Sequence, residues 1–428
     1  MLFRTKTADK RGQSKNVCFV RHGYCPDDPR TKKQSTALVE AGYNVDIICL
    51  KMARQAFHEH TDGLRVFRIP ITHKRTTMGR YFFEYGLSFL LFSIVLMYLH
   101  LRNRYRCIHV ATMPDLLVFA TLVPKLLGAK ILLDLHEPTP ELWFTKYGHS
   151  MQFLLRLQMK IEQRAIKFAD MAITVTDELR NRLVERGARP EKIAVVRNVC
   201  DDDVFSCPTD ARKSRSNDGF CLITHGLIEE RYGHEEMIRA VSNLRGAIPN
   251  LRLDILGSGE FETQLKQLVE DLNCSDIVHF LGYVPHDDLM RRLKAADVGI
   301  IAMRRSPYSE LIDTNKMYEY VSLRKPVIVS RLPPVERMFD DSCVKLYEPG
   351  DYQALARCIM ELYLDPGQGR ELVENAYRRY AKICWRNSKK EYVKVVDDLV
   401  AGRNRTRTSS GHAPRAGAKQ VCESVMSQ

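Results

Sequence analysis

Residues 313–330, DTNKMYEYVSLRKPVIVS, combine a charged cluster with an apolar strand. Asp313, Lys316 and Glu319 are spaced three apart, so on a helix they share one face. The apolar run after Pro326 is typical of a strand buried in a parallel sheet. Ligands of open α/β sheets bind beyond the carboxyl ends of such strands, which makes this helix a candidate for ligand binding.

The start of this helix could bind an anion. Thr314 and Asn315 stand where free N–H groups and the helix dipole favour negative charge, and Lys316 would add a full positive charge. Glu319, one turn later, could accept hydrogen bonds from vicinal hydroxyls such as those of a ribose. The alternative is an exposed Lys–Glu pair that contributes only about 0.2–0.5 kcal/mol.

Two further segments join a strand to a loop and a helix. In DILGSGE, Gly257 and Gly259 would let backbone N–H groups approach a phosphate at the start of a helix that opens on Glu260. A structural tight turn explains these glycines equally well. In THGLIEERYGHEE, Gly226 ends a strand, and Arg231 could neutralise an anion in a cleft or could be a solvated loop residue.

The N-terminal half has candidate residues of its own. In LLDLHEPTPELW, His136 and Glu137 follow a strand and are expected to face a cleft. The loop after the first strand places three more residues on the same edge: His22, Gly23 and Asp28. The alternative for Asp28 is a helix-capping role.

Short apolar runs alternate with helical patterns along the chain, which predicts βαβ units and parallel sheets. The expected strands are 17–20, 45–50, 66–69, 107–111, 131–135, 171–175, 193–196, 220–224, 251–256, 277–280, 298–303, 326–330 and 343–347. We therefore expect an α/β fold with two doubly wound domains facing across a cleft. Their expected limits are 1–205 and 206–385, with a helix at 386–400 that packs back on the body and a disordered basic tail at 401–428.

Composition restricts the class of protein. The 428 residues are 45% hydrophobic, enough for two cores, and the net charge of +13 favours anionic partners. Twelve cysteines without a CxxC pair, and an N-terminus without an apolar core, favour a reduced cytosolic compartment. No cluster has the spacing of metal ligands, so no metal is expected. No basic stripe is interleaved with aromatic residues, so nucleic acid is not an expected partner.

One apolar segment differs from the other helical patterns. Residues 86–101, GLSFLLFSIVLMYLHL, run from Gly86 to Leu101 without a formal charge. Arg80 and Glu84 precede them, and Arg102, Arg104 and Arg106 follow. A spanning helix needs about 20 apolar residues. Three interpretations stay open: a crossover helix buried on the sheet, a surface helix whose outer side dips into a bilayer, and a true span, which would break the sheet apart.

These segments, in this order, resemble the retaining GT-B glycosyltransferases of glycosyltransferase family 4. The similarity covers about residues 16–385 and rests on DPRTKKQSTALVEAGYNVDIICL, LLDLHEPTPELW, FADMAITVTDEL with KIAVVRN, GLIEERYGHEEMIRA, LRLDILGSGE, IVHFLGYVPHDDLMRRLKAADVGIIAM and NKMYEYVSLRKPVIVS. It implies two Rossmann-like domains, a nucleotide-sugar donor held mainly by the C-terminal domain and an acceptor bound mainly by the N-terminal one. It also implies no metal or other cofactor.

The resemblance assigns roles to single residues. The family's basic pair, which binds the donor diphosphate, matches Arg231 and Tyr232, although the second position is commonly lysine. Lys316 is the candidate that supplies the missing charge. His136 matches the cleft histidine, which is expected to hold the donor sugar and the reacting groups in place.

The family also has two glutamates spaced eight apart. Glu319 matches the second, which binds the ribose hydroxyls, whereas the first would fall at Leu311. Either a shift of one residue brings in Glu310, or Asp313 and backbone amides take its place. The expected donor residues are therefore Gly226, Arg231, Gly257, Gly259, Glu310, Asn315, Lys316 and Glu319, and the expected acceptor residues are His22, Gly23, Asp28 and Glu137.

The resemblance implies hexosyl transfer with retention, catalysed by His136, Arg231 and Lys316 through stabilisation of the departing nucleoside diphosphate. We expect a lipid-linked or cell-surface polysaccharide precursor as acceptor, and a cytoplasmic enzyme that is peripheral at the inner membrane face. Two other functions stay open. One is a sugar-nucleotide epimerase or hydrolase on the same fold, and the other is a non-catalytic sugar-nucleotide-binding subunit.

Overall fold

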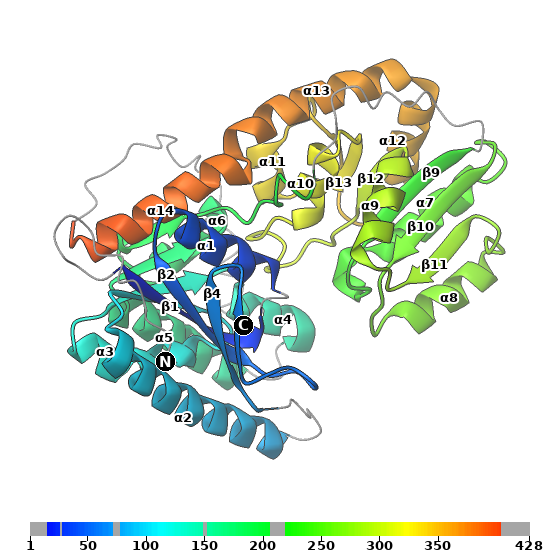
Figure 1. Ribbon diagram of the computed structural model, residues 1–428. Coiled ribbons are helices and arrows are strands. Elements are labelled where there is room, and N and C mark those ends of the chain that lie inside the picture. The colour runs from blue at the N-terminus through cyan, green and yellow to red at the C-terminus, as the bar shows by residue number, and fades with distance from the viewer. Residues whose placement is uncertain (1–14, 26–27, 72–77, 149–151, 206–218, 404–428) are drawn as a thin grey trace.

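The computed structural model describes residues 15–25, 28–71, 78–148, 152–205 and 219–403. These residues form two sheets, each with helices on both faces, so the predicted architecture of two doubly wound α/β units is confirmed (Figure 1). The tail at 401–428 was predicted to be disordered, and from residue 404 onward it lies outside the described residues. Residues 206–218, between the two sheets, also lie outside them.

The first sheet has eight strands in the order β3-β4-β2-β1-β5-β6-β7-β8. Their bounds are β1 (Asn16–Tyr24), β2 (Asn44–Leu50), β3 (His58–Thr61), β4 (Leu64–Ile69), β5 (Cys107–Ala111), β6 (Lys130–Leu135), β7 (Met171–Thr174) and β8 (Ile193–Val195). All neighbours pair in parallel except β3 and β4. The central strands are almost fully buried, as apolar runs covered on both faces should be.

Two helical layers cover this sheet. The helices are α1 (Pro29–Glu40), α2 (Met78–Asn103), η1 (Asp115–Thr121), α3 (Leu122–Leu126), α4 (Thr139–Tyr147), α5 (Gln152–Phe168), α6 (Asp177–Glu185) and η3 (Pro190–Lys192). In Figure 1, α2, α3 and α5 lie below the sheet, and α1 and α6 lie above it. The inner side of α2 is buried through Ser88, Phe92 and Leu96, so the helix is one layer of this unit. Among the described residues, Glu84–Asn103 is also the one helix that is long and apolar enough to cross a membrane, and the spanning interpretation stays a prediction.

The second sheet has six parallel strands in the order β11-β10-β9-β12-β13-β14. The strands are β9 (Phe220–His225), β10 (Leu251–Leu256), β11 (Val278–Gly282), β12 (Val298–Ile301), β13 (Val327–Ser330) and β14 (Lys345–Tyr347). The helices are η4 (Glu230–Tyr232), α7 (His234–Leu244), α8 (Glu262–Asp271), α9 (His286–Ala295), α10 (Asn315–Ser322), α11 (Pro333–Met338), α12 (Tyr352–Leu364), α13 (Pro366–Ile383) and α14 (Trp385–Val400).

The C-terminal helices connect the two units. α13 packs on α10 and α12, whereas α14 crosses back to α1, β5 and β6 of the first sheet. There the hydroxyl of Tyr392 lies 2.9 Å from Nδ1 of His109, which is fully buried. In Figure 1 these two helices run along the top of the molecule from one unit to the other.

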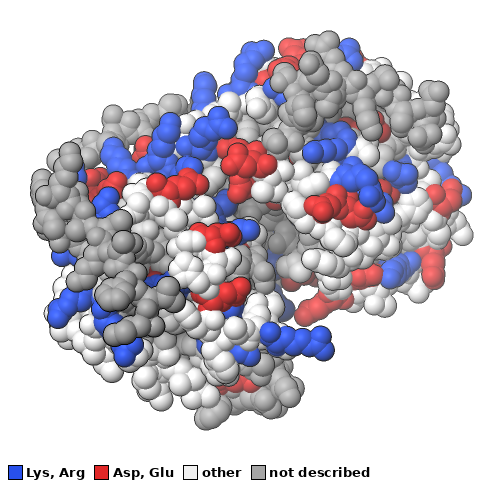
Figure 2. Space-filling model, viewed as in Figure 1, with Lys and Arg blue, Asp and Glu red and all other residues white. Residues whose placement is uncertain are grey.

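Both sheets reverse their strand order at one point, between β1 and β5 in the first and between β9 and β12 in the second. Ligands of doubly wound sheets bind outside the carboxyl ends of the strands at such points. The two carboxyl edges face each other, because the Tyr308 hydroxyl donates to Glu137 at 2.9 Å across the interface. Figure 2 shows the two units as lobes with a recess between them.

Two local predictions are corrected. The helix α10 begins at Asn315, so Asp313 lies before it, and its carboxylate accepts a hydrogen bond from Tyr318. The predicted common face of Asp313 with Lys316 and Glu319 is therefore wrong. The helix after the Gly257 turn begins at Glu262 and not at Glu260.

Candidate active site

Lys316 is placed by the first turn of α10 and by a glycine at the end of β9. Gly226 has φ +112°, and a Cβ there would lie 2.9 Å from Cε of Lys316. Any side chain at 226 would therefore displace the lysine. The N-cap residue Thr314 makes no side-chain hydrogen bond to the helix, so it does not compete for the first N–H groups of α10.

Two cations meet at one aromatic ring in this part of the cleft. The Lys316 ammonium lies 4.5 Å from the centre of the Tyr232 ring, and the Arg231 guanidinium lies 5.0 Å from it. Arg231 also lies 5.4 Å from the Tyr308 ring and pairs with Glu229 at 2.6 Å. Tyr232 thus holds both positive charges in place at a position where the family resemblance expects lysine.

The environment of Lys316 disfavours its charge. Burial lowers the pKa of Lys316 to about 8, and nearby Arg231 adds to this effect while Glu319 opposes it. Burial and the proximity of Lys316 also hold the pKa of His234 at about 3, so this first residue of α7 is neutral. Two helices, α7 and α10, therefore begin beside Lys316, and their N-termini favour an anion there.

Glu319 is held by a histidine that the sequence analysis did not select. Nε2 of His225 lies 2.7 Å from the Glu319 carboxylate, and Nδ1 lies 3.0 Å from the Tyr320 hydroxyl. His225 is the last residue of β9, directly before Gly226. The sequence did contain a signal for His225, because it ends a predicted strand and directly precedes Gly226, which was selected as a site residue.

The glycines of the DILGSGE turn have a packing role. Their loop pairs with the loop after β9, where the Gly226 amide donates to the Leu256 carbonyl at 2.9 Å. A Cβ on Gly257 would lie 1.9 Å from the Gly226 carbonyl oxygen, and one on Gly259 would lie 2.1 Å from that of Ile228. The tight-turn explanation therefore accounts for both glycines, which position the loop that carries Gly226.

On the opposite edge, His136 is bound by an arginine that the sequence analysis also missed. Nη1 of Arg21 donates to Nε2 of His136 at 2.9 Å, and Nη2 donates to Asp28 at 2.8 Å. Because arginine can only donate, Nε2 of His136 accepts and the proton sits on Nδ1. Burial and Arg21 lower the pKa of His136 to about 4, so the imidazole is neutral.

Asp28 caps α1, which was the alternative to its predicted role on the acceptor side, and it also binds Arg21. One oxygen accepts from the Thr31 amide at 2.7 Å and caps α1, and the other binds Arg21. Gly23 leaves room for Arg21, since a Cβ there would lie 3.3 Å from Nε. The cap thereby links the start of α1 to the histidine of the cleft.

A buried ion pair supports this edge from below. Arg30 donates two hydrogen bonds to Asp134, at 2.8 and 2.9 Å, and Asp134 is fully buried. Although burial alone would raise it, the pKa of Asp134 lies well below its ordinary value because Arg30 and His109 stabilise the carboxylate. The pair fixes the end of β6, from which His136 follows.

Two further residues were predicted on the acceptor side, Glu137 and His22, and they lie in different parts of the first unit. Glu137 meets Tyr308 between the two units, and burial raises the pKa of Glu137 despite the nearby arginines. His22 instead faces α2, where Nε2 lies 3.1 Å from the Ser88 hydroxyl and the ring lies 4.9 Å from that of Tyr85. His22 thus connects the cleft edge to the apolar helix.

The position of the family's first glutamate has a different use in this chain. Leu311 is 4% exposed, and its carbonyl accepts a hydrogen bond from the Thr176 hydroxyl of the other unit. Glu310 pairs with Arg305 at 3.4 Å. The residue that would contact the donor sugar here remains a prediction.

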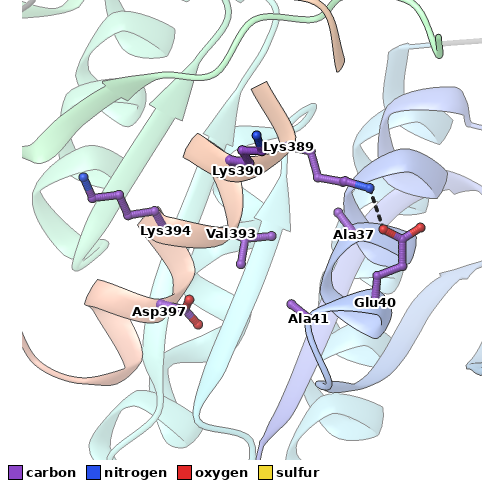
Figure 3. Close-up of a pocket in the computed structure, with 8 residues that line it drawn as sticks. All are labelled: Ala37, Glu40, Ala41, Lys389, Lys390, Val393, Lys394 and Asp397. Carbon is purple, nitrogen blue, oxygen red and sulfur yellow. Dashed lines mark hydrogen bonds and ion pairs between the residues drawn. The ribbon is translucent and has the colours of Figure 1, made fainter. Parts of the chain in front are cut away.

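Metal-ligating side chains and the groove beside α14 are the two other features that bear on ligand binding. Within the described part of the chain, no group of three or more His, Cys, Asp and Glu side chains could hold a metal ion. A groove lies between α1 and α14, where Lys389 pairs with Glu40 at 2.6 Å (Figure 3). It lies at the C-terminal end of α1, whereas Asp28 and the cleft lie at its N-terminal end.

Comparison with known proteins identifies two family models along the chain. The model described as "Glycosyl transferase 4-like domain" matches residues 28–199, and that described as "Glycosyl transferases group 1" matches residues 208–379. Together the two matches cover most of the sequence, one over each sheet.

Individual proteins show the same similarity. The D-inositol 3-phosphate glycosyltransferase of Acidothermus cellulolyticus is 27% identical over 271 residues, 60% of this chain and 59% of that protein. The GDP-mannose-dependent monoacylated alpha-(1-6)-phosphatidylinositol monomannoside mannosyltransferase of Corynebacterium glutamicum is 27% identical over 185 residues, 42% of this chain and 48% of that protein. The chain therefore matches less than two thirds of the length of these relatives. Sucrose-phosphate synthase of Thermosynechococcus elongatus superposes with a TM-score of 0.74 at 19% identity, over 90% of this chain and 99% of that one.

Proposed function

The chain belongs to the GT-B glycosyltransferases of glycosyltransferase family 4, and on this premise we propose that it transfers a hexosyl group from a nucleotide-sugar donor to an acceptor hydroxyl. The observation that carries the proposal is the contact of Arg231 and Lys316 with one tyrosine ring, close to Glu319. Two cations beside a carboxylate suit a diphosphate that is followed by a ribose.

The donor is proposed to lie along the second sheet. Its diphosphate contacts Arg231, Lys316 and the N-termini of α7 and α10, including Asn315. Its ribose hydroxyls donate to Glu319, which His225 orients. The relative described as GDP-mannose-dependent supports a nucleotide-sugar donor.

The reaction is proposed to proceed with retention of the anomeric configuration. The bond between the anomeric carbon and the leaving phosphate oxygen breaks, and the acceptor oxygen bonds to that carbon on the same face. The proton of the acceptor hydroxyl passes to the leaving phosphate oxygen. Arg231 and Lys316 stabilise the negative charge that develops on the diphosphate. No step is assigned to a metal.

The acceptor is proposed to lie against the first sheet, near His136 and Glu137, with the loop of His22, Gly23 and Asp28 at its margin. His136 positions the reacting groups as a neutral imidazole, because its Nε2 is bound by Arg21. The proposed acceptor is a lipid-linked or cell-surface polysaccharide precursor. The proposed location is the cytoplasmic side of the inner membrane, which the protein contacts through residues 86–101.

The proposal is tested by incubating the full chain with a panel of nucleotide sugars and candidate acceptors. The transferase proposal is supported if nucleoside diphosphate is released only when acceptor is present. Retention is supported if an NMR coupling constant shows that the product has the anomeric configuration of the donor. Release at the same rate without acceptor would indicate a hydrolase, and a changed sugar on the recovered donor would indicate an epimerase.

A further inference from the structure

Exposed apolar side chains are concentrated on one side of the molecule. Of the 21 large apolar residues that are exposed in the described chain, 15 lie on α2, on α5, or between Met113 and Leu127. Those on α2 include Leu90, Ile94 and Leu101, which face away from the sheet. A soluble monomer rarely exposes an apolar patch of more than a few hundred Å² without a function.

The patch extends well beyond the apolar segment that the sequence marks. Leu126 on α3 is 78% exposed, and Phe153 on α5 is 77% exposed. α2 packs against η1 and α3, and α5 packs against η1, so these four elements form one continuous layer below the first sheet (Figure 1). We call this surface, formed by the outer faces of α2, η1, α3 and α5, the apolar plane.

The charges on the apolar plane have one sign. Every carboxylate in the described parts of these four elements is buried, namely Glu84, Asp115 and Glu162. The exposed charged residues on α2 and α5 are all basic: Arg102, Arg156, Lys160, Arg164 and Lys167. In Figure 2 much of the lower left surface of the first unit is white, with blue residues at its left margin.

The basic residues also have a geometry that suits a lipid headgroup region. The Arg102 guanidinium lies 4.6 Å from the centre of the Tyr98 ring, and both side chains are exposed. A tyrosine with an arginine at the end of an apolar helix places an amphipathic ring and a cation where a bilayer is polar. A surface whose exposed charges are all basic is complementary to a layer of anionic headgroups.

The apolar plane reaches the proposed acceptor side of the cleft. The N-terminal part of α2 lies at the carboxyl edge of the sheet, since the helix leads from β4 back to the start of β5. At this end Ser88 is hydrogen-bonded to His22, and Leu87 beside it is exposed. A molecule anchored in a layer below α2 therefore has a short path to the cleft.

From these observations we propose that the apolar plane docks the protein on an anionic lipid bilayer, and that its cleft end receives a lipid-linked acceptor. The proposed docking depends only on the apolar and basic side chains of this surface. The proposed binding of a lipid-linked acceptor also rests on the transferase function proposed above. Apolar side chains of all four elements enter the region between headgroups and acyl chains, and the basic residues contact anionic headgroups.

The test measures flotation of the full chain with vesicles of phosphatidylcholine, alone and with about 30% phosphatidylglycerol. Leu126→Glu on α3 and Phe153→Glu on α5 are each expected to reduce binding about tenfold or more. The control is Leu364→Glu, a residue of α12 that is 71% exposed and lies outside the apolar plane, and it should bind as wild type. Unchanged melting temperatures show that all variants are folded.

Charge is tested separately with Arg156→Ala and Lys160→Ala. Each should lower binding to the anionic vesicles about fivefold and leave binding to phosphatidylcholine unchanged. Wild-type flotation of Leu126→Glu and Phe153→Glu would overturn the proposal, as would a failure of the wild-type chain to bind either vesicle. A wild-type dimer that Leu126→Glu dissociates, without vesicle binding, would identify a second copy as the occupant and also overturn it.

Transfer is measured in parallel on a water-soluble acceptor and on a lipid-linked one. Leu126→Glu should keep its rate on the soluble acceptor and lose rate on the lipid-linked acceptor in vesicles. Vesicle binding without any transfer would refute the transferase function but not the docking. Transfer without vesicle binding would refute the docking alone.

Discussion

The ammonium of Lys316 lies 4.5 Å from the centre of the Tyr232 ring. Arg231 lies on the same ring, so the chain keeps two positive charges at a place where the family resemblance expects a lysine in the position of the tyrosine. The ring stabilises both cations without adding a third charge. The cleft thereby has the positive charge that a diphosphate needs, although the sequence motif is altered.

Replacing Tyr232 should separate the role of the ring from that of the hydroxyl. Tyr232→Phe keeps both cation–ring contacts, so donor affinity should stay within about threefold of wild type. Tyr232→Ala removes a contribution of about 0.5–2 kcal/mol and should weaken donor binding by about 2–30-fold. Isothermal titration with nucleoside diphosphate measures both, and equal weakening in the two variants would contradict the role of the ring.

The pH dependence of donor binding should follow Lys316. Its pKa of about 8 means that the side chain is charged below this pH and neutral above it. Between pH 7.5 and 9.5 the diphosphate charge is constant, so affinity should fall as pH rises, by at most about tenfold per unit. Lys316→Met should bind weakly with a flat profile over this range, and a sloping profile in that variant would assign the titration to another group.

Glu319 should act on the ribose and not on the phosphates. Glu319→Ala removes a charged hydrogen-bond acceptor, so nucleoside diphosphate affinity should fall by about 1.5–3 kcal/mol. Pyrophosphate lacks the ribose, and its affinity should stay the same or rise, because a carboxylate near Lys316 is removed. Calorimetric titrations of Glu319→Ala with nucleoside diphosphate and with pyrophosphate measure the two affinities. A parallel loss for both ligands would mean that the glutamate only supports the fold.

The Arg30–Asp134 pair should be a large contributor to stability. Arg30→Met leaves the fully buried carboxylate of Asp134 without its main partner, and the free energy of unfolding should fall by about 3–5 kcal/mol. The matched control is Lys389→Met, which removes an exposed pair with Glu40 and should cost about 0–1 kcal/mol. Urea unfolding measures both, and equal losses would contradict the assignment.

The sequence predicted the two sheets because buried parallel strands have long apolar runs, such as those of β1 and β6. It missed β3, HEHT, because this exposed edge strand is polar and has no apolar alternation. It found Lys316 and Glu319 from helical spacing within one segment. It placed Asp313 on the same face, because the sequence does not show where the helix begins.

Partners that are distant in sequence could not be predicted in the same way. Arg21 and His136 are 115 residues apart, and only the pairing of β1, β5 and β6 brings them together. Leu126 and Phe153 lie in ordinary helical patterns, and the sequence does not show which side of a helix the sheet leaves uncovered. The apolar segment 86–101 could be recognised in the sequence because it is long. The rest of the apolar plane could not be predicted from the sequence.

The most direct test of the account is calorimetry of nucleoside diphosphate binding to wild type, Lys316→Ala and Lys389→Ala at pH 7. The account predicts that wild type and Lys389→Ala bind alike, and that Lys316→Ala loses about 2–3 kcal/mol of binding free energy or more, since a charge-assisted contact in a partly desolvated cleft is removed. Wild-type affinity in Lys316→Ala would contradict the placement of the donor diphosphate at Lys316.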